Sequence, residues 1–150
     1  MNINLREITR DNWRECVRLK VADDQQKFVA SNAVSLAQSK YEPECVPLAA
    51  YDGDIIVGFV MYRPEDYGIS KLWFIDRLLV GIQYQGKGYG RATMEVLIAH
   101  LKSVPGYSAI LISFVPDNAA AEKLYSSLDF VDTGEIDEGE IVYRLAIGKV

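Results

Sequence analysis

The sequence predicts a mixed α/β fold. Three observations predict it: short apolar runs of strand length alternate with stretches of helical periodicity, a glycine-rich segment joins a strand to a helix in mid-chain, and the composition is ordinary for a globular domain. The chain has 150 residues, of which 49% are hydrophobic and 25% charged, enough to bury one core. No repeat, low-complexity tract or linker interrupts the sequence, so we expect one domain over residues 1–150.

Charge and cysteine content exclude several classes of protein. Sixteen Lys and Arg against 21 Asp and Glu give a net charge of -5, which argues against a nucleic-acid partner. The acidity suits a cationic substrate, although solubility alone also explains it. Two distant cysteines and one histidine cannot form a Cys/His zinc site, so we expect no metal. Without a signal pattern or a long apolar run, the chain is expected to be cytoplasmic, with no membrane partner.

The N-terminal region is expected to form a strand followed by two helices. Residues 2–8 alternate between apolar and polar side chains, as in a strand with one buried face. Residues 9–12 supply polar capping side chains for a helix whose apolar positions begin at Trp13. A second, weaker helix is expected over residues 28–40, because Pro43 follows shortly after it.

Three strands are expected next. Residues 46–51 and 55–62 flank the turn signal Asp52-Gly53 and predict a hairpin. After a loop at residues 64–68, residues 71–80 predict a long third strand. Strict alternation along that strand predicts two faces, one carrying Leu72, Phe74, Asp76, Leu78 and Val80, the other Lys71, Trp73, Ile75, Arg77 and Leu79.

The second half is expected to form two helices and three strands. A helix with a stripe of Met94, Leu97, Ile98 and Leu101 ends before Pro105. Residues 109–114 predict a buried strand, and Asp117-Asn118 caps a helix with apolar positions at Ala121, Leu124, Tyr125 and Leu128. Residues 130–136 and 140–147 are expected to pair as a hairpin around Asp137-Glu138-Gly139.

The glycine-rich loop between the third strand and the next helix is suited to a phosphate. Three glycines at positions 86, 88 and 90 let backbone N–H groups converge on an anion, and the helix N-terminus adds positive charge. A Walker A loop is excluded because Gly88, not Ser or Thr, follows Lys87. A dinucleotide fingerprint is weak, because the pattern is GxGxG and follows several other elements.

Two segments together resemble the GCN5-related N-acetyltransferase (GNAT) family. The first is Gln85-Gly86-Lys87-Gly88-Tyr89-Gly90, and the second is the set Asn118, Ala121, Leu124, Tyr125 and Phe130. One departure is Asp129, where the family usually has Gly before the Phe; Asp tolerates the left-handed turn after a helix. The resemblance implies the GNAT fold, a mostly antiparallel mixed sheet flanked by helices in the order β-α-α-β-β-β-α-β-α-β-β, with acetyl-CoA as cosubstrate.

The resemblance also implies which residues hold the cosubstrate. They are the strand end Leu78, Leu79 and Val80, the loop residues Gln85, Gly86, Lys87, Gly88, Tyr89 and Gly90, and Arg91 and Asn118. A backbone N–H of Leu79 or Val80 would polarise the thioester carbonyl. Tyr125 would act as the acid that protonates the leaving thiolate, although its place on an apolar stripe is also explained by packing.

Acidic residues are the candidates for binding the amine. Asp76 interrupts an apolar strand, where an unpaired carboxylate is costly. It either lines the acceptor cleft as a base or amine anchor, or pairs with Arg77 or a neighbouring strand. Glu42 and Glu44 either help to bind the cation or are solvated loop charges.

The acceptor is suggested by a narrower resemblance. Residues 41–43, 46–48, 51–54, 73–77 and 83–90 look like those of bacterial spermine/spermidine acetyltransferases. This implies acetyl transfer to a polyamine by direct attack in a ternary complex. Another amine, a protein N-terminus and a non-catalytic CoA-binding module stay open as alternatives. A homodimer also stays open, with exposed aromatics such as Trp73 and the C-terminal hairpin as its seam.

Overall fold

The computed structural model describes residues 1–148, except for the side chain of Tyr67, and confirms the predicted α/β class and order of elements. Two short 3₁₀ turns, η1 and η2, are added to that order. The elements are β1 (Ile3–Glu7), α1 (Trp13–Arg18), η1 (Asp23–Gln25), α2 (Asn32–Tyr41), β2 (Val46–Asp52), β3 (Ile55–Tyr67), β4 (Ser70–Val80), η2 (Ile82–Tyr84), α3 (Tyr89–Ser103), β5 (Ala109–Phe114), α4 (Ala119–Ser127), β6 (Val131–Asp137) and β7 (Glu140–Ala146).

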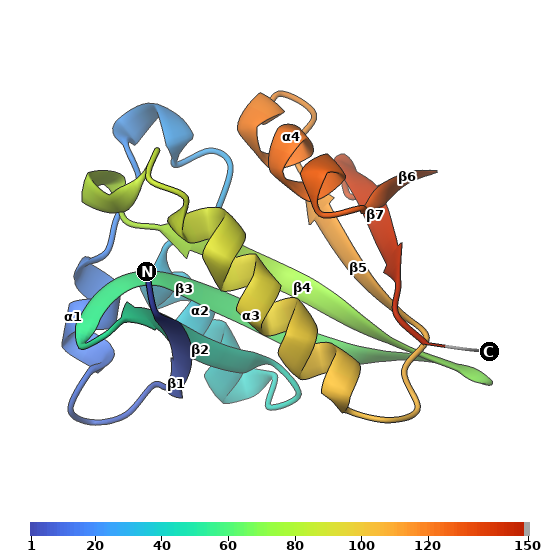
Figure 1. Cartoon of the computed structure of the whole chain (residues 1–150), viewed down its shortest axis with the longest axis horizontal. Helices are drawn as coiled ribbons and strands as arrows, with labels where there is room; N and C mark the ends of the chain where they lie inside the picture. The colour runs from blue at the N-terminus through green and yellow to red at the C-terminus, as the bar shows by residue number, and fades with distance from the viewer. Residues whose placement is uncertain (149–150) are drawn as a thin grey trace.

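The seven strands form one sheet in the order β1-β2-β3-β4-β5-β7-β6. All neighbours are antiparallel except β4 and β5, which are parallel. Their pairing is short, from Leu72 opposite Ala109 to Ile75 opposite Ile112. Beyond Ile75 the two strands diverge, β4 toward η2 and β5 toward α4 (Figure 1). The two central strands of the sheet are therefore separated from each other at one of their ends.

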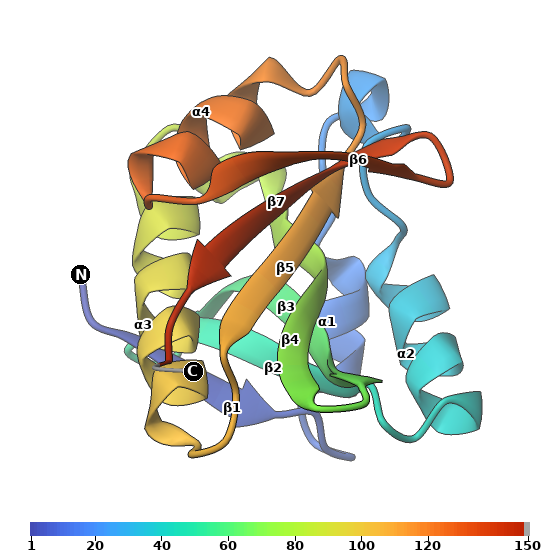
Figure 2. The same cartoon turned by 90° about the vertical axis from the view of Figure 1, so that its right-hand side faces the viewer.

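Helices cover both faces of the sheet (Figure 2). On one face, α3 and α4 bury a large apolar cluster that includes Met94, Leu97, Ile110 and Tyr125. On the other, α1 and α2 cover a second cluster that includes Cys16, Phe59 and Leu79. Within residues 1–148, no helix is long and apolar enough to cross a membrane.

A bulge in β4 overturns the predicted alternation of its side chains. Met61 of β3 pairs with Arg77 but the next residue, Tyr62, pairs with Ile75, so Asp76 is an extra residue in β4. As a result Leu78 packs with Ile75 in the α3 cluster, whereas Leu79 belongs to the α1 cluster. The prediction that Leu78 shares a face with Phe74, and Leu79 with Ile75, is wrong beyond Ile75.

Three further expectations are corrected. Most of the loop expected at residues 64–68 is strand: β3 continues through Pro64, which pairs with Trp73, to residue 67, and only Gly68 belongs to the turn. The second helix begins at Asn32 rather than at residue 28, because Ser31 caps it by accepting a hydrogen bond from the N–H of Val34. Trp73 is not an exposed seam, since it is only 8% exposed and stacks on Tyr107 with ring centroids 3.8 Å apart.

Asp129 has a φ of 71°, so it does adopt the left-handed conformation expected where the family usually has Gly. It follows α4 and lets the chain turn back toward Phe130, which is buried against Tyr125. Asp129 thus makes the left-handed turn that glycine makes most readily.

Candidate active site

A cleft of about 1070 Å³ opens where β4 and β5 separate. Most of its wall comes from five stretches: residues 76–80 of β4, the glycine-rich loop and first helical residues (85–90), the start of α4 (118–125), the connection before α2 (25–30) and the β6–β7 hairpin (137–140). The split in the sheet therefore brings the glycine-rich loop, Tyr125 and Asp76, three of the features singled out in the sequence, to one cavity. The connection and the hairpin were not predicted to contribute.

The glycine-rich loop presents backbone N–H groups. Gly86 and Gly88 have φ values of 73° and 89°, in the left-handed region that other residues rarely adopt. Gly88 is the N-cap of α3 and offers no side chain to the first turn, and the helical bonding begins with the N–H of Ala92 to the carbonyl of Gly88 at 3.1 Å. The N–H groups before Ala92 are thus open to an anion, favoured by the dipole of a 15-residue helix.

Gln85 has a different role from the backbone around it. Its Nε2 donates to the carbonyl of Val80 at 2.9 Å, and its amide pairs with the amide of Gln25 at 3.0 Å. One side chain therefore joins the end of β4, the glycine-rich loop and η1. Gln25 was missed by the sequence reasoning, because nothing in its local pattern indicates a partner 60 residues away.

Two charged residues expected at the cosubstrate do not line the cleft. Lys87 donates from Nζ to the carbonyl of Gln83 at 3.1 Å, and it is exposed. Arg91 bonds to Ser127 at 2.6 Å and pairs with Glu95 at 3.0 Å. These side chains brace the outside of the loop and of α3, so the cleft meets the loop mainly through backbone.

Two other expected residues line the cleft but also make internal hydrogen bonds. The hydroxyl of Tyr89 donates to Asp52 at 2.7 Å, which ties the start of α3 to the β2–β3 turn. The side chain of Asn118 accepts from the N–H of Ala121 at 3.1 Å, as an N-cap of α4. Both residues therefore hold in place the helix ends that border the cleft.

The end of β4 offers an unpaired backbone edge. On one side, Leu79 and Val80 pair with Phe59 and Gly58 of β3. Gly58 is required there, because a Cβ would lie 2.8 Å from the carbonyl oxygen of Leu79. On the other side β4 has no β5 partner beyond Ile75, so its edge faces the cleft. That edge can hydrogen-bond an extended chain and can polarise a carbonyl.

Tyr125 both packs and lines the cleft. It is 6% exposed, and its ring contacts those of Phe114 and Phe130. Burial raises the pKa of its phenol well above the usual value, and the negative charge of Glu140 raises it further. The hydroxyl therefore stays protonated at neutral pH, and it can donate a hydrogen bond to an atom in the cleft.

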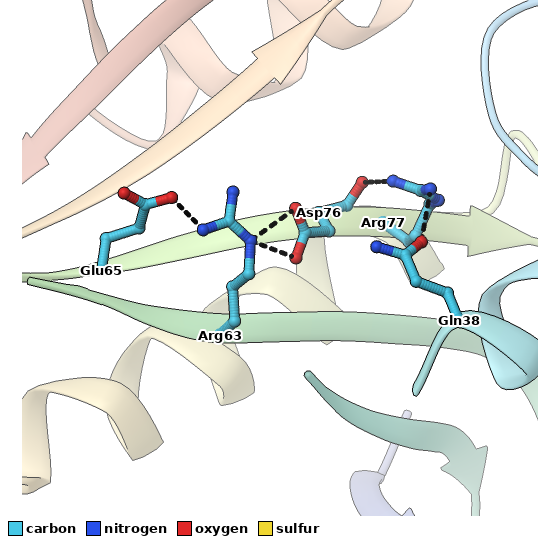
Figure 3. Close-up of polar contacts among 5 residues, drawn as sticks. All are labelled: Gln38, Arg63, Glu65, Asp76 and Arg77. Atoms are coloured by element: carbon cyan, nitrogen blue, oxygen red, sulfur yellow. Dashed lines mark hydrogen bonds and ion pairs between the residues drawn. The ribbon is translucent and has the colours of Figure 1, made fainter. Parts of the chain in front are cut away.

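Asp76 lies at the centre of a polar network that crosses the cleft wall (Figure 3). Its two carboxylate oxygens lie 3.2 and 3.1 Å from Nε of Arg63, and Arg63 also pairs with Glu65. Arg77 donates to the backbone carbonyl of Asp76 at 2.9 Å and to Gln38 of α2 at 3.0 Å. Because of the bulge, Asp76 and Arg77 project from the same face of the sheet.

The pKa of Asp76 is raised, because the cost of burial outweighs the attraction of Arg63. The two alternatives drawn from the sequence therefore coincide: Asp76 lines the cleft and is also paired with the neighbouring strand, through Arg63 rather than through the side chain of Arg77. A carboxylate retained at a net electrostatic cost is a candidate for a functional group.

The lining of the cleft is acidic. The carboxylates that line the cleft are Glu42, Glu44, Asp76, Asp137, Glu138 and Glu140, and the cations are Lys27, Arg63 and Arg77. Six acids against three bases leave a net charge of -3 on the lining. Glu42 and Glu44 are exposed at its rim, in the position the sequence suggested. The three hairpin acids were seen in the sequence only as a turn and its flank.

Neither cysteine is placed to be a nucleophile. Cys16 is fully buried, and burial raises the pKa of its thiol to about 11. Cys45 is 3% exposed, and burial raises the pKa of its thiol as well. Neither lines the cleft. In the part of the chain that is described, no three His, Cys, Asp or Glu side chains gather as metal ligands would.

The chain is similar to known proteins over most of its length. The "Acetyltransferase (GNAT) family" matches residues 4–130. Spermine/spermidine N(1)-acetyltransferase of Bacillus subtilis (strain 168) is 32% identical over 142 residues, covering 91% of this chain and 93% of that protein.

Two solved structures share the fold. Spermidine N-acetyltransferase from Vibrio cholerae, in complex with CoA and spermine, has a TM-score of 0.73 at 16% identity and covers 97% of this chain and 96% of its own. An aminoglycoside acetyltransferase in complex with coenzyme A has a TM-score of 0.80 at 17% identity, covering 97% and 95%. Identities this low show a common fold alone.

Proposed function

The chain belongs to the acetyltransferase (GNAT) family and is an N-acetyltransferase; from that premise we propose that it moves the acetyl group of acetyl-CoA to a primary amine of a polyamine. The observation that carries the proposal is the two-ended cleft, with an anion-binding backbone at one end and six carboxylates against three cations along its lining. The spermine/spermidine acetyltransferase of B. subtilis, at 32% identity, supports the choice of acceptor.

In this proposal the cosubstrate lies between the glycine-rich loop and β4. The open N–H groups from Gly86 to Arg91 and the N-terminus of α3 bind its pyrophosphate. The unpaired edge of β4 bonds the pantetheine arm, and an N–H of Leu79 or Val80 polarises the thioester carbonyl. Acetyl-CoA supplies the activated acetyl group, and the protein positions it.

The acceptor must lose a proton before it reacts. An alkyl amine has a pKa of about 10.4, so forming the neutral amine at pH 7 costs roughly 4–5 kcal/mol. The neutral nitrogen then attacks the carbonyl carbon directly. The N–C bond forms, the C–S bond breaks, and the nitrogen loses its remaining extra proton to Asp76 or to solvent. The sequence suggested Tyr125 as the acid, but the raised pKa of its phenol opposes full proton transfer. In the proposal Tyr125 therefore donates a hydrogen bond to the departing thiolate, which takes its proton from solvent. Buried, weakly acidic thiols at Cys16 and Cys45 favour this direct attack over an acyl-enzyme.

Asp76 and the rim acids would attract the cation. In the proposal Asp76, which lies where β4 and β5 separate, is the base or the amine anchor. The acceptor amine competes with Arg63 for the carboxylate of Asp76. Glu42 and Glu44 guide the polycation from the rim.

The test is release of free thiol from acetyl-CoA in the presence of a panel of amines. Spermidine and spermine are expected to accelerate release most, and mass spectrometry should find one added acetyl group on the polyamine. If an aminoglycoside or a peptide with a free N-terminus accelerated thiol release instead, the proposed acceptor would be wrong, and the assignment to the family would stand. Thiol release equal to the amine-free control for every amine would identify a CoA-binding module.

A further inference from the structure

The split in the sheet is bordered by two strand edges, β4 from Asp76 onward on one side and β5 from Ser113 onward, with its partner β7, on the other; we call these edges the two lips of the split. The last paired residues of β4 and β5 are Ile75 and Ile112, so the next residues, Asp76 and Ser113, stand on opposite sides of the split. Asp76 projects from the face away from α3, since its neighbour Ile75 packs in the α3 cluster. Ser113 likewise projects away from α3, because its neighbour Ile112 is in the same cluster.

Glu140 lies on the lip formed by β5 and β7. Ser113 pairs with Val142, and Glu140 is two residues before Val142, so Ser113 and Glu140 share a face of the sheet. The hydroxyl of Ser113 donates to Oε1 of Glu140 at 2.9 Å, which orients the carboxylate. Glu140 also lines the cleft. The two lips therefore carry one carboxylate each, Asp76 and Glu140, on the same side of the sheet.

The two carboxylates differ in what already binds them. Asp76 is held by Arg63. Within the described residues no Lys, Arg or His lies within ion-pair distance of Glu140, whose recorded partner is a neutral hydroxyl. A half-buried carboxylate without a cation is costly, and a bound ammonium would compensate it. Of the two lip carboxylates, Glu140 is the one open to a ligand.

The position of Glu140 decides which nitrogen it can bind. Its neighbour Ile141 pairs with Phe114, whose ring centroid lies 5.6 Å from that of Tyr125, so Glu140 lies close to the proposed reacting centre. A carboxylate in contact with the reacting nitrogen would hold that nitrogen as ammonium and oppose attack. No such conflict arises for a nitrogen one alkyl spacer farther along the acceptor, which stays charged throughout.

We propose that Glu140, oriented by Ser113, binds the second, non-reacting ammonium of a di- or polyamine and thereby determines the preference for polyamines over monoamines. This inference rests on the proposed function, and it goes beyond it by assigning the preference to one residue. The charged or titratable groups that line the same cleft include Asp76, Arg77 and Arg63 on the opposite side of the split, Tyr125 on α4, and Asp137 and Glu138 on the hairpin; farther along the lining are Lys27, Glu42, Glu44, Tyr84 and Tyr89.

The test compares two acceptors that present the same primary amine, spermidine and n-butylamine, at saturating acetyl-CoA. The ratio of their kcat/KM values is measured for the wild type, Glu140→Gln, Ser113→Ala and Glu135→Gln. Glu140→Gln keeps an oxygen for Ser113 and removes only the charge. Glu135→Gln is the matched control, an exposed acid of β6 on the same hairpin that does not line the cleft.

The expected result is a fall of roughly tenfold to a hundredfold in the ratio for Glu140→Gln, through the KM of spermidine, with butylamine turnover retained. Ser113→Ala should lower the ratio less, and Glu135→Gln should leave it unchanged. Thermal unfolding and CoA affinity are measured on each variant to establish that it is folded.

Each of the other possible results rejects a specific claim. A wild type that prefers spermidine, with the same ratio in Glu140→Gln, rejects the role of Glu140 and leaves the proposed function standing. Equal losses for both amines in a folded Glu140→Gln protein place Glu140 at the reacting nitrogen, against the proposal. A wild type with no preference for spermidine rejects both the polyamine function and the inference.

Discussion

The two ends of the cleft are built by different means. In the proposed function, the cosubstrate end is made largely of backbone, from one continuous segment around Gly86 and Gly88 and from the free edge of β4. The acceptor end is made of side chains that come from distant parts of the sequence, such as Arg63, Asp76 and Glu140. A backbone site needs particular backbone conformations and so appears as a motif, whereas a side-chain site can change its specificity by single substitutions without disturbing the fold.

Tyr125 gives the strongest test of this comparison, because we propose that its side chain acts at the end of the cleft that is otherwise made of backbone. Tyr125→Phe should lower kcat about a hundredfold, since the hydrogen bond to the leaving sulfur is lost. Stability should change little, because the ring still packs against Phe114 and Phe130. Steady-state kinetics and thermal unfolding measure the two effects. Because the pKa of Tyr125 is raised, its ionisation should not limit the wild-type rate between about pH 7 and 9.

If kcat were unchanged in Tyr125→Phe, Tyr125 would have only a packing role. The cosubstrate end would then consist of backbone throughout, and the contrast between the two ends would be sharper than we propose.

Gly86→Ala should damage the cosubstrate end through its backbone. Gly86 has φ 73°, and a Cβ there would meet no atom of the protein within 4 Å, so the fold loses only the roughly 1–2 kcal/mol of left-handed strain. The KM for acetyl-CoA should rise about tenfold, because the methyl group and the altered loop obstruct the phosphate. Gly134→Ala is the matched control, with φ 80° and equally open surroundings away from the cleft. Equal KM values in the two variants would argue against phosphate binding by this loop.

Asp76→Asn should have the smallest effect and acts at the acceptor end. Arg63 keeps Glu65 as a partner, so stability at pH 7 should stay within about 1 kcal/mol of the wild type. The kcat/KM for the amine should fall several-fold. Since the folded pKa of Asp76 is raised, the unfolded chain releases this proton first as pH rises from about 4. The wild type then loses stability relative to Asp76→Asn, until the folded pKa is passed.

Chemical denaturation of the two proteins between pH 4 and 7 measures that difference. A large loss of stability in Asp76→Asn at pH 7, with normal kcat/KM in the folded fraction, would make the Asp76–Arg63 pair purely structural.

Much of the fold could be predicted because its signals are local. The turn at Asp52-Gly53, the cap at Asn118 and the apolar stripe around Leu97 each depend on neighbours a few residues away, and the structure has them where expected. The glycine-rich loop was predictable for the same reason. Its glycines are required by the backbone, and φ values of 73° and 89° at Gly86 and Gly88 explain why.

The acceptor end could be predicted only in part: Asp76, Glu42 and Glu44 were candidates from the sequence, but the contacts that position its side chains are pairings across the sheet. Arg63 reaches Asp76 only because β3 continues past Tyr62, where Pro64 suggested a loop. Gln25 meets Gln85 from 60 residues away. Strict alternation also failed at the bulge, since nothing in the run of residues 71–80 shows that one residue is extra. Local patterns carry no information on register between distant strands.

The bulge at Asp76 also bears on how this gene can change over generations. Substitutions at this position keep the phase of β4, so Leu78 and Leu79 go on facing their own clusters. Loss of this one codon would remove the bulge: Arg77 would follow Ile75 directly, opposite Met61 and Tyr62, and Leu78 and Leu79 would keep their clusters, so the fold would be retained and the cleft would lose one carboxylate. The exposed turn at Gly68 and Ile69 also tolerates a change of length, so length variation among descendants is expected at these two places rather than elsewhere in the strand.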